Sequence, residues 1–563
     1  MFSMPFRSAN FKSQAAITSM EDRIVRVRED IKDLKSFYHI SISPTRESRL
    51  REYYNSELDS LEQLDFSSFD QHDKVDYLLL KNYLERQLRD LDLQATMDKK
   101  ADVLLSSYAR QIVQLCENRV RVVRMDAKNA AEELSRVHEE IVQVKGQVGK
   151  AQIALDRSSA FRAARIVDEL RSNLQEWFGF YKGYDPLFSW WVPAPYTEVE
   201  SSLCELAAAI RQKMVGVQPD DKDTIVGQPI GRQGLLEELS AEMIDYSPEE
   251  IIWIGERERL WCETELKKVS QELGYGNDWH RAMEYVKDLY VEPGKQRELV
   301  HDLAWEAIEF VQRHDMVTVP PLAAEAWQTF MMSPERQKIN PFFLGGECIQ
   351  VSYPTGAMSH EDKLMSLRGN NIHFSRATVF HELIPGHHLQ LFMNARYRTY
   401  RQLFDTPFWI EGWSLYWEMI LWDNDRFPKT LENRLGMLFW RLHRCARIVF
   451  SIKFHLGQMT PQQCVDFLVR NVGHERATAE GEVRRSLSGE YPPLYQAGYM
   501  LGALQIYSLR QEQVGSGRMT QKEFHDGILR NNCMPIELLR ALLQHQPLSR
   551  EYRACWKFYE HGL

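Results

Sequence analysis

The sequence has few of the features that mark secreted, membrane-spanning or nucleic-acid-binding proteins. Its eight cysteines among 563 residues are scattered and form no C-x-x-C pair, which argues against a disulfide framework and favours a reducing compartment. No uninterrupted apolar run reaches the ~20 residues that cross a bilayer, and the first residues lack the apolar core of a signal peptide. From these absences we expect a cytoplasmic protein with no membrane partner.

Charge of one sign is not concentrated either. The 69 basic and 79 acidic residues leave a formal net charge of −10, and no block of lysine and arginine stands out. Such a chain has no electrostatic reason to coat nucleic acid. Glycine and proline are not enriched, and the hydrophobic share of 44% is ordinary for a folded protein. Because the length exceeds what one small core needs, we expect two or three packed regions.

What the sequence does contain is helical periodicity over most of its length. Segment 75–93, for example, places leucines at helical spacing with charged residues between them. A stretch rich in Asp, Gly and Pro at 217–235 predicts a linker or long loop. Segment 347–356 is the best strand candidate, because Ile349, Val351 and Tyr353 alternate with more polar residues. We predict a mainly α fold in three regions: an N-terminal helical region at 1–216, a linker and middle helical region at 217–346, and a third helical region at 347–563 that contains the motifs described next.

The strongest chemical signal is the segment ATVFHELIPGHHLQLF at 377–392. A hydrolytic zinc site uses about three protein ligands from His, Glu and Asp and keeps one position open for water. In the helical H-E-x-x-H pattern, two histidines share one helix face and the glutamate lies beside the bound water as general base. Here His381 and Glu382 are present, but Pro385 occupies the position of the second histidine and cannot bind a metal.

Two histidines further along the chain are candidates for that second ligand. Pro385 lacks an N–H and its ring crowds the carbonyl of His381, so the helix must kink or bulge there, and Gly386 can absorb the distortion. A two-residue bulge would bring His387 onto the face of His381. His388 is on that face of a straight helix, but roughly 10 Å along its axis. We prefer His387 as ligand, with His388 contacting substrate or supporting the ligands, and the reverse assignment stays open.

The third ligand is expected from a carboxylate on a following helix. The segment PFWIEGWSLYWEMIL at 407–421 offers Glu411, 24 residues after His387, and Glu418. The glycine after Glu411 would let another helix approach closely. Glu418 lies two turns further on the same face and suits a hydrogen bond to a ligating histidine. So many ligand-capable groups in mostly apolar surroundings would be costly to bury without a purpose, which favours a Zn²⁺ site.

At these residues the sequence resembles a known family. The pattern H-E-x-x-P-G-H-H-x-Q followed by E-G-W-x-x-Y-x-E is similar to that of the domain of unknown function 885 family, itself distantly similar to carboxypeptidase Taq and angiotensin-converting-enzyme-like zinc metallopeptidases. The resemblance implies a large helical metallopeptidase-like fold with a deep cleft and a small β element near the zinc helix. It implies zinc held by His381, His387 and Glu411, with Glu382 as base. By analogy, the strand near 347–356 would hold an extended peptide by backbone pairing.

A second segment, SGEYPPLYQAGYMLGALQIYSLR at 488–510, resembles a tyrosine-containing segment of the carboxypeptidase Taq family. The resemblance implies a tyrosine that donates a hydrogen bond to the oxyanion formed when water adds to a carbonyl. Tyr495 is the first choice and Tyr491 the second. Those relatives place a histidine shortly before the tyrosines, whereas this chain has EVRR at 482–485. Arg485 is expected either to bind a substrate carboxylate through a bidentate fork or to pair with a structural acid.

Together these features predict a zinc-dependent hydrolase that cleaves an amide or peptide bond by metal-activated water, with Glu382 moving the proton. A metallopeptidase acting on short peptides is the first interpretation. A zinc-dependent biosynthetic enzyme acting on a small non-peptide metabolite is the second, and a helical binding protein without catalysis is the third. The sequence leaves open the substrate, exo- versus endo-cleavage, the native metal and the oligomeric state, a homodimer included.

Overall fold

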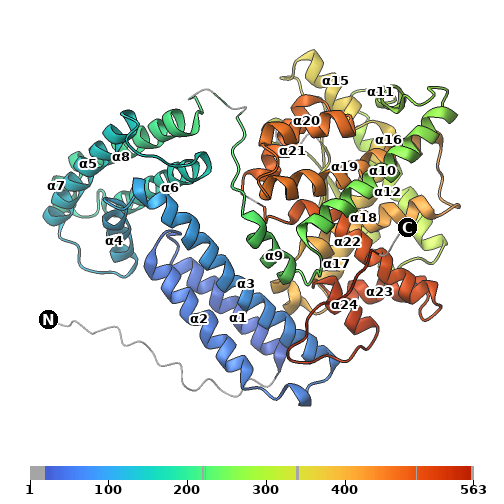
Figure 1. Ribbon diagram of the computed structural model, residues 1–563, viewed down its shortest axis with the longest axis horizontal. Helices are drawn as coiled ribbons and strands as arrows, with labels where there is room; N and C mark the ends of the chain where they lie inside the picture. The colour runs from blue at the N-terminus through green and yellow to red at the C-terminus, as the bar shows by residue number, and fades with distance from the viewer. Residues whose placement is uncertain (1–18, 219–220, 222–223, 338–341, 490, 560–563) are drawn as a thin grey trace.

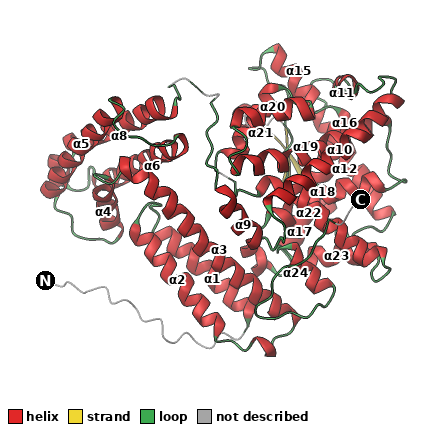
Figure 2. Ribbon diagram, in the orientation of Figure 1, coloured by secondary structure: helices red, strands yellow, loops and turns green. Residues whose placement is uncertain are grey.

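The computed structural model describes residues 19–218, 221, 224–337, 342–489 and 491–559. Most of these residues lie in helices (Figure 2), and two short strands pair with each other. The predicted mainly α fold with a small β element is therefore confirmed. Many helices begin where a Ser, Thr or Asp side chain caps the first turn, as Ser19, Asp70 and Thr430 do. No helix within the described ranges is long and apolar enough to cross a membrane.

Three long helices begin the described chain. Their bounds are α1 (Met20–Phe37), α2 (Pro44–Glu62) and α3 (Gln71–Ala101). The 31-residue helix α3 changes its environment along its length. Leu79 packs in one hydrophobic core with residues of the C-terminal half, whereas Ala101 at the other end packs in a second core. α3 thus connects the two parts of the molecule.

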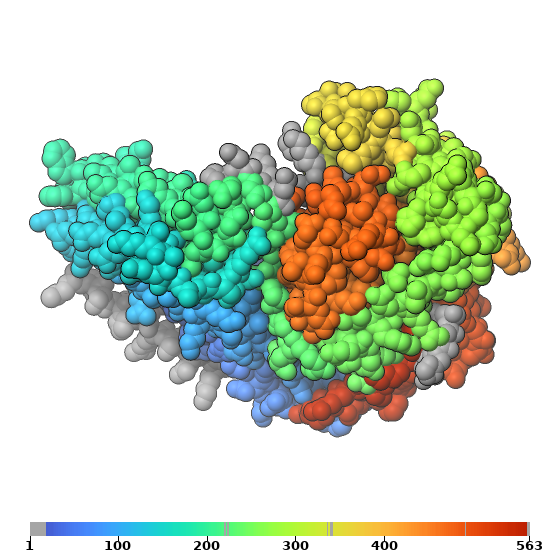
Figure 3. Space-filling view, turned by 45° about the horizontal axis from the view of Figure 1, so that its top comes forward, coloured from blue at the N-terminus to red at the C-terminus, as the bar shows by residue number. Residues whose placement is uncertain are grey.

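The second core belongs to an arm, residues 101–217, that extends to one side of the molecule (Figures 1 and 3). Fully buried side chains such as Leu134, Leu170 and Leu203 form this core. The arm helices are α4 (Ala109–Val120), α5 (Ala127–Gly149), α6 (Arg157–Tyr181), α7 (Pro186–Trp191) and α8 (Pro193–Ile210), followed by a π turn, η3 (Arg211–Val215).

The remaining helices form the body together with α1, α2 and most of α3. Nearly all side chains of α18 and α19 are buried, with Trp409, Trp413 and Trp417 of α18 among them. A helix that is apolar on most sides needs such complete coverage. The body helices are α9 (Gly231–Ala241), α10 (Pro248–Glu272), α11 (Trp279–Lys287), α12 (Gln296–Arg313), α13 (Pro321–Ala326), α14 (Pro334–Gln337), α15 (His360–Gly369), α16 (Ile372–Glu382), α17 (His387–Asn394), α18 (Pro407–Asp423), α19 (Leu431–His455), α20 (Pro461–Val472), α21 (Arg476–Leu487), α22 (Tyr495–Arg510), α23 (Gln521–Asn531) and α24 (Ile536–Leu543).

Each hydrophobic core is built from segments that are not all consecutive in the sequence. The body core joins residues 20–84 to residues 235–559, and most of the arm core lies between them in sequence. The predicted boundaries after residues 216 and 346 follow linear order and remain predictions. The candidate site residues at 381–499 all belong to the body.

α18 and α22 pack closely because glycines line their contact. A Cβ on Gly412 would lie 2.7 Å from the backbone of Gly502, and one on Gly502 would lie 2.0 Å from the carbonyl oxygen of Phe408. No larger residue fits at these positions unless the helices separate. The crossing brings Glu411 of α18 against the first turn of α22, which is the close approach that the glycine after Glu411 predicts.

The strands form a parallel pair beside α16. β1 (Gln328–Met331) pairs with β2 (Cys348–Val351). Ile349 and Val351 are fully buried in a small cluster with Val379 of α16, so the strand expected within 347–356 is present over four residues. On its other side, Gln350 exchanges two backbone hydrogen bonds with Leu344. At that position the chain itself occupies the edge at which a peptide was expected to pair.

Candidate functional site

The segment with the H-E-x-x-P-G-H-H pattern forms two helices. α16 ends at Glu382 and α17 begins at His387, and the peptide bond before Pro385 is cis. The distortion is therefore larger than the expected bulge, because a proline cannot donate the hydrogen bond that would continue α16. A Cβ on Gly386 would lie 1.9 Å from the carbonyl oxygen of His381, so the turn between the helices needs glycine.

Hydrogen bonds hold this break in place. The N–H of Gly386 donates to the carbonyl of Phe380 at 3.1 Å. From α18, Nε1 of Trp413 donates to the carbonyl of Pro385 at 2.9 Å. α18 therefore fixes the turn as well as contributing a carboxylate to the site.

The break turns His387 back toward His381, and Glu411 of α18 lies between them. Its Oε2 is 3.3 Å from Nε2 of His381 and 3.2 Å from Nε2 of His387. Two atoms bound tetrahedrally at about 2.0–2.1 Å from zinc lie about 3.3 Å apart, so each of these two separations fits a pair of ligands of one ion. All three residues are buried. The structure thus brings together the three side chains expected to bind the metal.

The three groups also set one another's protonation. Burial acts to lower the pKa of His381, but hydrogen bonds with Glu411 and Glu418 outweigh it and raise that pKa to about 9. Burial acts to raise the pKa of Glu411, but His387 and His381 hold it well below its usual value. The carboxylate is therefore ionised at neutral pH, as a metal ligand must be, and metal binding to His381 would release a proton.

Glu418 supports this arrangement from the next turns of α18. Its Oε1 is 2.8 Å from Nδ1 of His381, and the residue is buried. This is the position of a partner that fixes the ring and tautomer of a ligating histidine. The nitrogen that remains, Nε2, is the one that faces Glu411.

Glu382 lies beside the histidines without joining their pairing with Glu411. Ligand atoms of His381, Glu382 and His387 all lie within 4.8 Å of one another. A loop covers the carboxylate so closely that a Cβ on Gly345 would lie 2.0 Å from its Oε2. Burial raises the pKa of Glu382. A carboxylate with a raised pKa is better suited to accept and return a proton than one held ionised by two imidazoles.

The structure does not bring His388 into the cavity. Its Nδ1 is 2.9 Å from the carbonyl oxygen of Glu347, and its Nε2 is 3.1 Å from that of Ala323. Both nitrogens therefore contact backbone, which ties α17 to the segments before β2 and in α13. Between the two histidines left open by the sequence, His387 is the one that faces Glu411. His388 was predicted to contact substrate or to support the ligands, and in the structure its side chain contacts backbone carbonyls instead.

Tyrosines of α22 and the turn before it lie next to the ligands. Oη of Tyr495 donates to Oε1 of Glu411 at 2.5 Å, and Tyr491 packs against Tyr495 with ring centroids 4.5 Å apart. Tyr499 was missed by the sequence analysis, although its ring lies nearly parallel to that of His381 at 6.1 Å. Tyr499 lies four residues after Tyr495, so both are on one face of the helix. That spacing could have identified Tyr499 as a site residue.

Arg485 reaches the same cavity, with its guanidinium 5.0 Å from the ring centre of Tyr491. Glu482, which lies on the same helix as Arg485, accepts a hydrogen bond from Nε of Arg447 at 2.5 Å. Arg447 and Arg444 of α19 also line the cavity and were missed by the sequence analysis. Two arginines three residues apart, and so on one face of a helix, were the signal that could have identified them.

These groups share one cavity of about 330 Å³, a size typical of sites for small ligands. Its polar lining includes His381, Glu382, His387, Glu411, Arg444, Arg447, Glu482, Arg485, Tyr491, Tyr495 and Tyr499.

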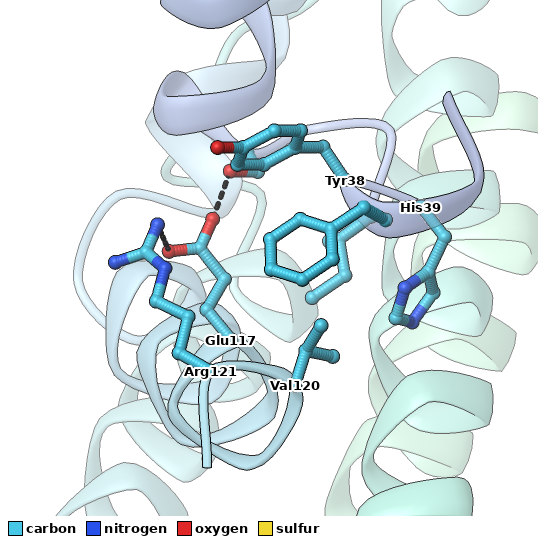
Figure 4. Close-up of a pocket in the computed structure, with 8 residues that line it drawn as sticks. Tyr38, His39, Glu117, Val120 and Arg121 are labelled. Carbon is cyan, nitrogen blue, oxygen red and sulfur yellow. Dashed lines mark hydrogen bonds and ion pairs between the residues drawn. The ribbon is translucent and has the colours of Figure 1, made fainter. Parts of the chain in front are cut away.

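A second, much smaller pocket lies between the end of α1 and α4 (Figure 4). Tyr38, His39 and Arg121 are among its lining residues, and it encloses about 10 Å³, about the space of one water molecule. Its Glu117 pairs with Arg121 at 3.1 Å and accepts a hydrogen bond from Ser43. This pocket therefore has room for little more than one water molecule beside a paired acid.

Comparison with known proteins gives a family and a fold. The model of a family described as "Bacterial protein of unknown function (DUF885)" matches residues 39–543. The structure of "a putative lipoprotein of unknown function" from Shewanella oneidensis superposes with a TM-score of 0.68 at 17% identity, covering 94% of this chain and 100% of that one. A second "putative lipoprotein", from Colwellia psychrerythraea, gives a TM-score of 0.60 at 15% identity, covering 94% and 99%. No curated protein matches the chain.

Proposed function

The chain belongs to the DUF885 family, whose description assigns no function, and we propose that it is a zinc-dependent hydrolase of the metallopeptidase type. The observation that carries this proposal is that Oε2 of Glu411 lies 3.3 Å from Nε2 of His381 and 3.2 Å from Nε2 of His387. Two imidazoles and one carboxylate are a usual ligand set of hydrolytic zinc sites, which keep a further position open.

His381 and His387 would bind the ion through Nε2, and Glu411 through Oε2. When bound, zinc polarises a substrate carbonyl and lowers the pKa of water. Glu418 holds the ring of His381 through Nδ1, which leaves Nε2 for the metal. The remaining oxygen of Glu411 accepts a hydrogen bond from the hydroxyl of Tyr495, so each proposed ligand except His387 has a supporting partner on α18 or α22.

Glu382 is the proposed general base. It would accept a proton from water as the water attacks the carbonyl, and return that proton to the leaving amine. Its raised pKa favours this exchange. Tyr495 is the proposed donor to the oxyanion, because its hydroxyl lies beside the ligands and needs only to turn from Glu411 toward the substrate. Tyr491, packed against it, is the second choice.

Short peptides are the proposed substrates, because a cavity of about 330 Å³ suits a few residues better than a folded protein. The same side chains would hydrolyse an amide in a small non-peptide metabolite, so a biosynthetic enzyme remains the second interpretation. A panel of dipeptides and blocked peptides separates the two, since cleavage of none of them by zinc-loaded protein would favour a metabolite. A helical binding protein without catalysis remains the third interpretation.

The cytoplasmic location stays a prediction. The two similar structures are called lipoproteins, but at 17% and 15% identity they are related to this chain by fold alone.

The first test is the metal content of the purified protein, measured by plasma mass spectrometry. We expect about one zinc per chain, and its loss in His387→Ala and in Glu411→Ala. His301→Ala is the matched control, because the side chain of His301 is exposed and the variant should keep its zinc. Folded protein that binds no metal when zinc is offered at neutral pH would contradict the proposal.

A further inference from the structure

One part of the cavity carries more positive charge than its acids neutralise. Arg444 and Arg447 of α19 and Arg485 of α21 line it, with Glu482 beside them. Glu482 accepts a hydrogen bond from Nε of Arg447. Burial acts to raise the pKa of Glu482, but Arg447 and then Arg485 hold it at about 2, so this acid is ionised. Arg447 and Arg485 therefore share this carboxylate, while Arg444 acts on the carboxyl group of Glu382.

The guanidinium groups still have hydrogen-bond donors to offer. Arg444 is 7% exposed and Arg447 is 3% exposed. Among the described residues, none accepts a hydrogen bond from Nε of Arg444, Nη1 of Arg447 or Nε of Arg485. Leaving buried charged donors without acceptors is unfavourable. The planar fork of arginine matches the two oxygens of a carboxylate, so an anion entering the cavity would neutralise positive charge that the chain leaves uncompensated.

Aromatic rings hold these arginines in fixed positions. The Cζ atoms of Arg444 and Arg447 lie 4.7 Å and 4.5 Å from the ring centre of Tyr499. The guanidinium of Arg485 lies over Tyr491. Cation–π contacts of this kind favour a defined orientation of the cation. The cluster is thus preorganised, unlike arginines on an exposed surface.

The arginine cluster also lies near the candidate metal ligands. The ring of Tyr499 is 6.1 Å from that of His381 and 4.5 Å from Cζ of Arg447. Arg447 is therefore less than about 11 Å from His381, a separation that up to about three extended residues of about 3.3–3.6 Å each can bridge.

We propose that Arg444, Arg447 and Arg485 form a subsite for a carboxylate of the substrate, within about three residues of the bond that is cleaved. This inference rests on the proposed hydrolase function and adds a substrate class to it. The C-terminal carboxylate of a short peptide is the first source of that group, and the side chain of an Asp or Glu near the cleaved bond is the other. A peptide whose carboxylates are all blocked leaves the three guanidinium groups without their anion.

The test measures binding to metal-free protein, so that it does not depend on catalysis. The full chain is treated with a chelator, and the affinities of N-acetyl-Ala-Ala and of its C-terminal amide are measured by calorimetry. We expect the free acid to bind about 10-fold or more tightly than the amide, as charge-assisted hydrogen bonds would require. Arg485→Gln and Arg444→Gln should each remove most of that preference. Arg476→Gln, an exposed position on the same helix as Arg485, is the matched control and should keep it.

Equal affinity for acid and amide would overturn the subsite, and so would a preference that survives in both variants. Unfolding midpoints are measured for every variant. Arg485 is only partly buried, so Arg485→Gln keeps the test decisive if Arg444→Gln does not fold. N-acetyl-Asp amide distinguishes the two sources: binding like that of the free acid supports a subsite that accepts side chains, and no binding supports recognition of the chain end.

The two proposals fail separately. Protein that holds no zinc but prefers the free acid would contradict the hydrolase and leave the subsite standing. Protein that holds zinc and prefers neither probe would overturn the subsite alone.

Discussion

At the residue scale, Glu382 and the three proposed ligands have separable roles, although they lie within one small volume. Glu382→Gln keeps the size of the side chain and removes the proton acceptor. We expect this variant to keep its zinc and to lose about 10²–10⁴-fold in turnover, measured on a peptide that the unaltered protein cleaves. Zinc content is determined on the same samples. Loss of metal together with activity would identify Glu382 as a ligand and contradict its role as base.

Glu418 acts through His381 rather than on substrate. Its hydrogen bond to Nδ1 fixes the ring that would bind the metal. We expect Glu418→Gln to weaken zinc binding by about 10–100-fold, measured by competition with a chelating dye. Asp425→Asn, at an exposed position just beyond α18, is the control and should leave the affinity unchanged. Unaltered zinc affinity in Glu418→Gln would show that the bond has no such role.

Glu482 makes the stability of the arginine cluster depend on pH. Burial opposes its ionised form, yet Arg447 and Arg485 keep its pKa at about 2, below the usual 4.5. Because the folded pKa is depressed, its contribution to the free energy of unfolding is fully present above pH 4.5 and is lost as the pH falls toward 2. We expect the difference in unfolding free energy between the protein and Glu482→Gln to narrow below about pH 4.5. Urea unfolding across pH checks this, and a difference that stays constant to about pH 3.5 would contradict it.

At the element scale, the crossing of α18 and α22 positions the site. Glu411 and Tyr495 come from these two helices, and their hydrogen bond needs the close approach that Gly412 and Gly502 allow. The glycine that follows Glu411 in the sequence predicted a close approach of another helix at Gly412. It did not identify the partner helix, because Gly502 lies far along the chain and the contact exists only after folding.

Gly502→Ala tests this crossing. The added Cβ would lie 2.0 Å from the carbonyl oxygen of Phe408, so α18 and α22 must separate. We expect a loss of about 1–3 kcal/mol or more in unfolding free energy, measured by urea denaturation, together with weaker zinc binding. Gly179→Ala in α6, where a Cβ meets nothing within 4 Å, should be neutral or slightly stabilising. Equal effects of the two changes would contradict the importance of the crossing.

The break between α16 and α17 could also be predicted only in part from the sequence. Pro385 and Gly386 indicated a distortion, since the loss of an N–H and the freedom of glycine are local properties. The extent of the break depends on contacts from elsewhere, including the hydrogen bond from Trp413 to the carbonyl of Pro385. The spacing of residues along one helix does not predict a hydrogen bond from a different helix.

At the scale of the whole molecule, the separate cores of arm and body should respond differently to the metal. The proposed ligands lie in the body, and the arm helices α5 and α6 pack in their own core. A metal that binds only the folded body stabilises it by mass action. We therefore expect a chelator to reduce amide hydrogen-exchange protection in α16, α18 and α22 while leaving α5 and α6 unchanged. Similar losses in arm and body would contradict this separation.

The sequence by itself determined the mainly helical fold, the strand within 347–356 and the residue types of the candidate metal site. These depend on periodicity, caps and short motifs that act over a few residues. Only the tertiary structure decided that His387 faces Glu411 while His388 contacts backbone, and that Arg444, Arg447 and Arg485 share one cavity. The physical reason is that the direction of a chain after a break, and the set of side chains around a cavity, are fixed by packing between segments that are distant in the sequence.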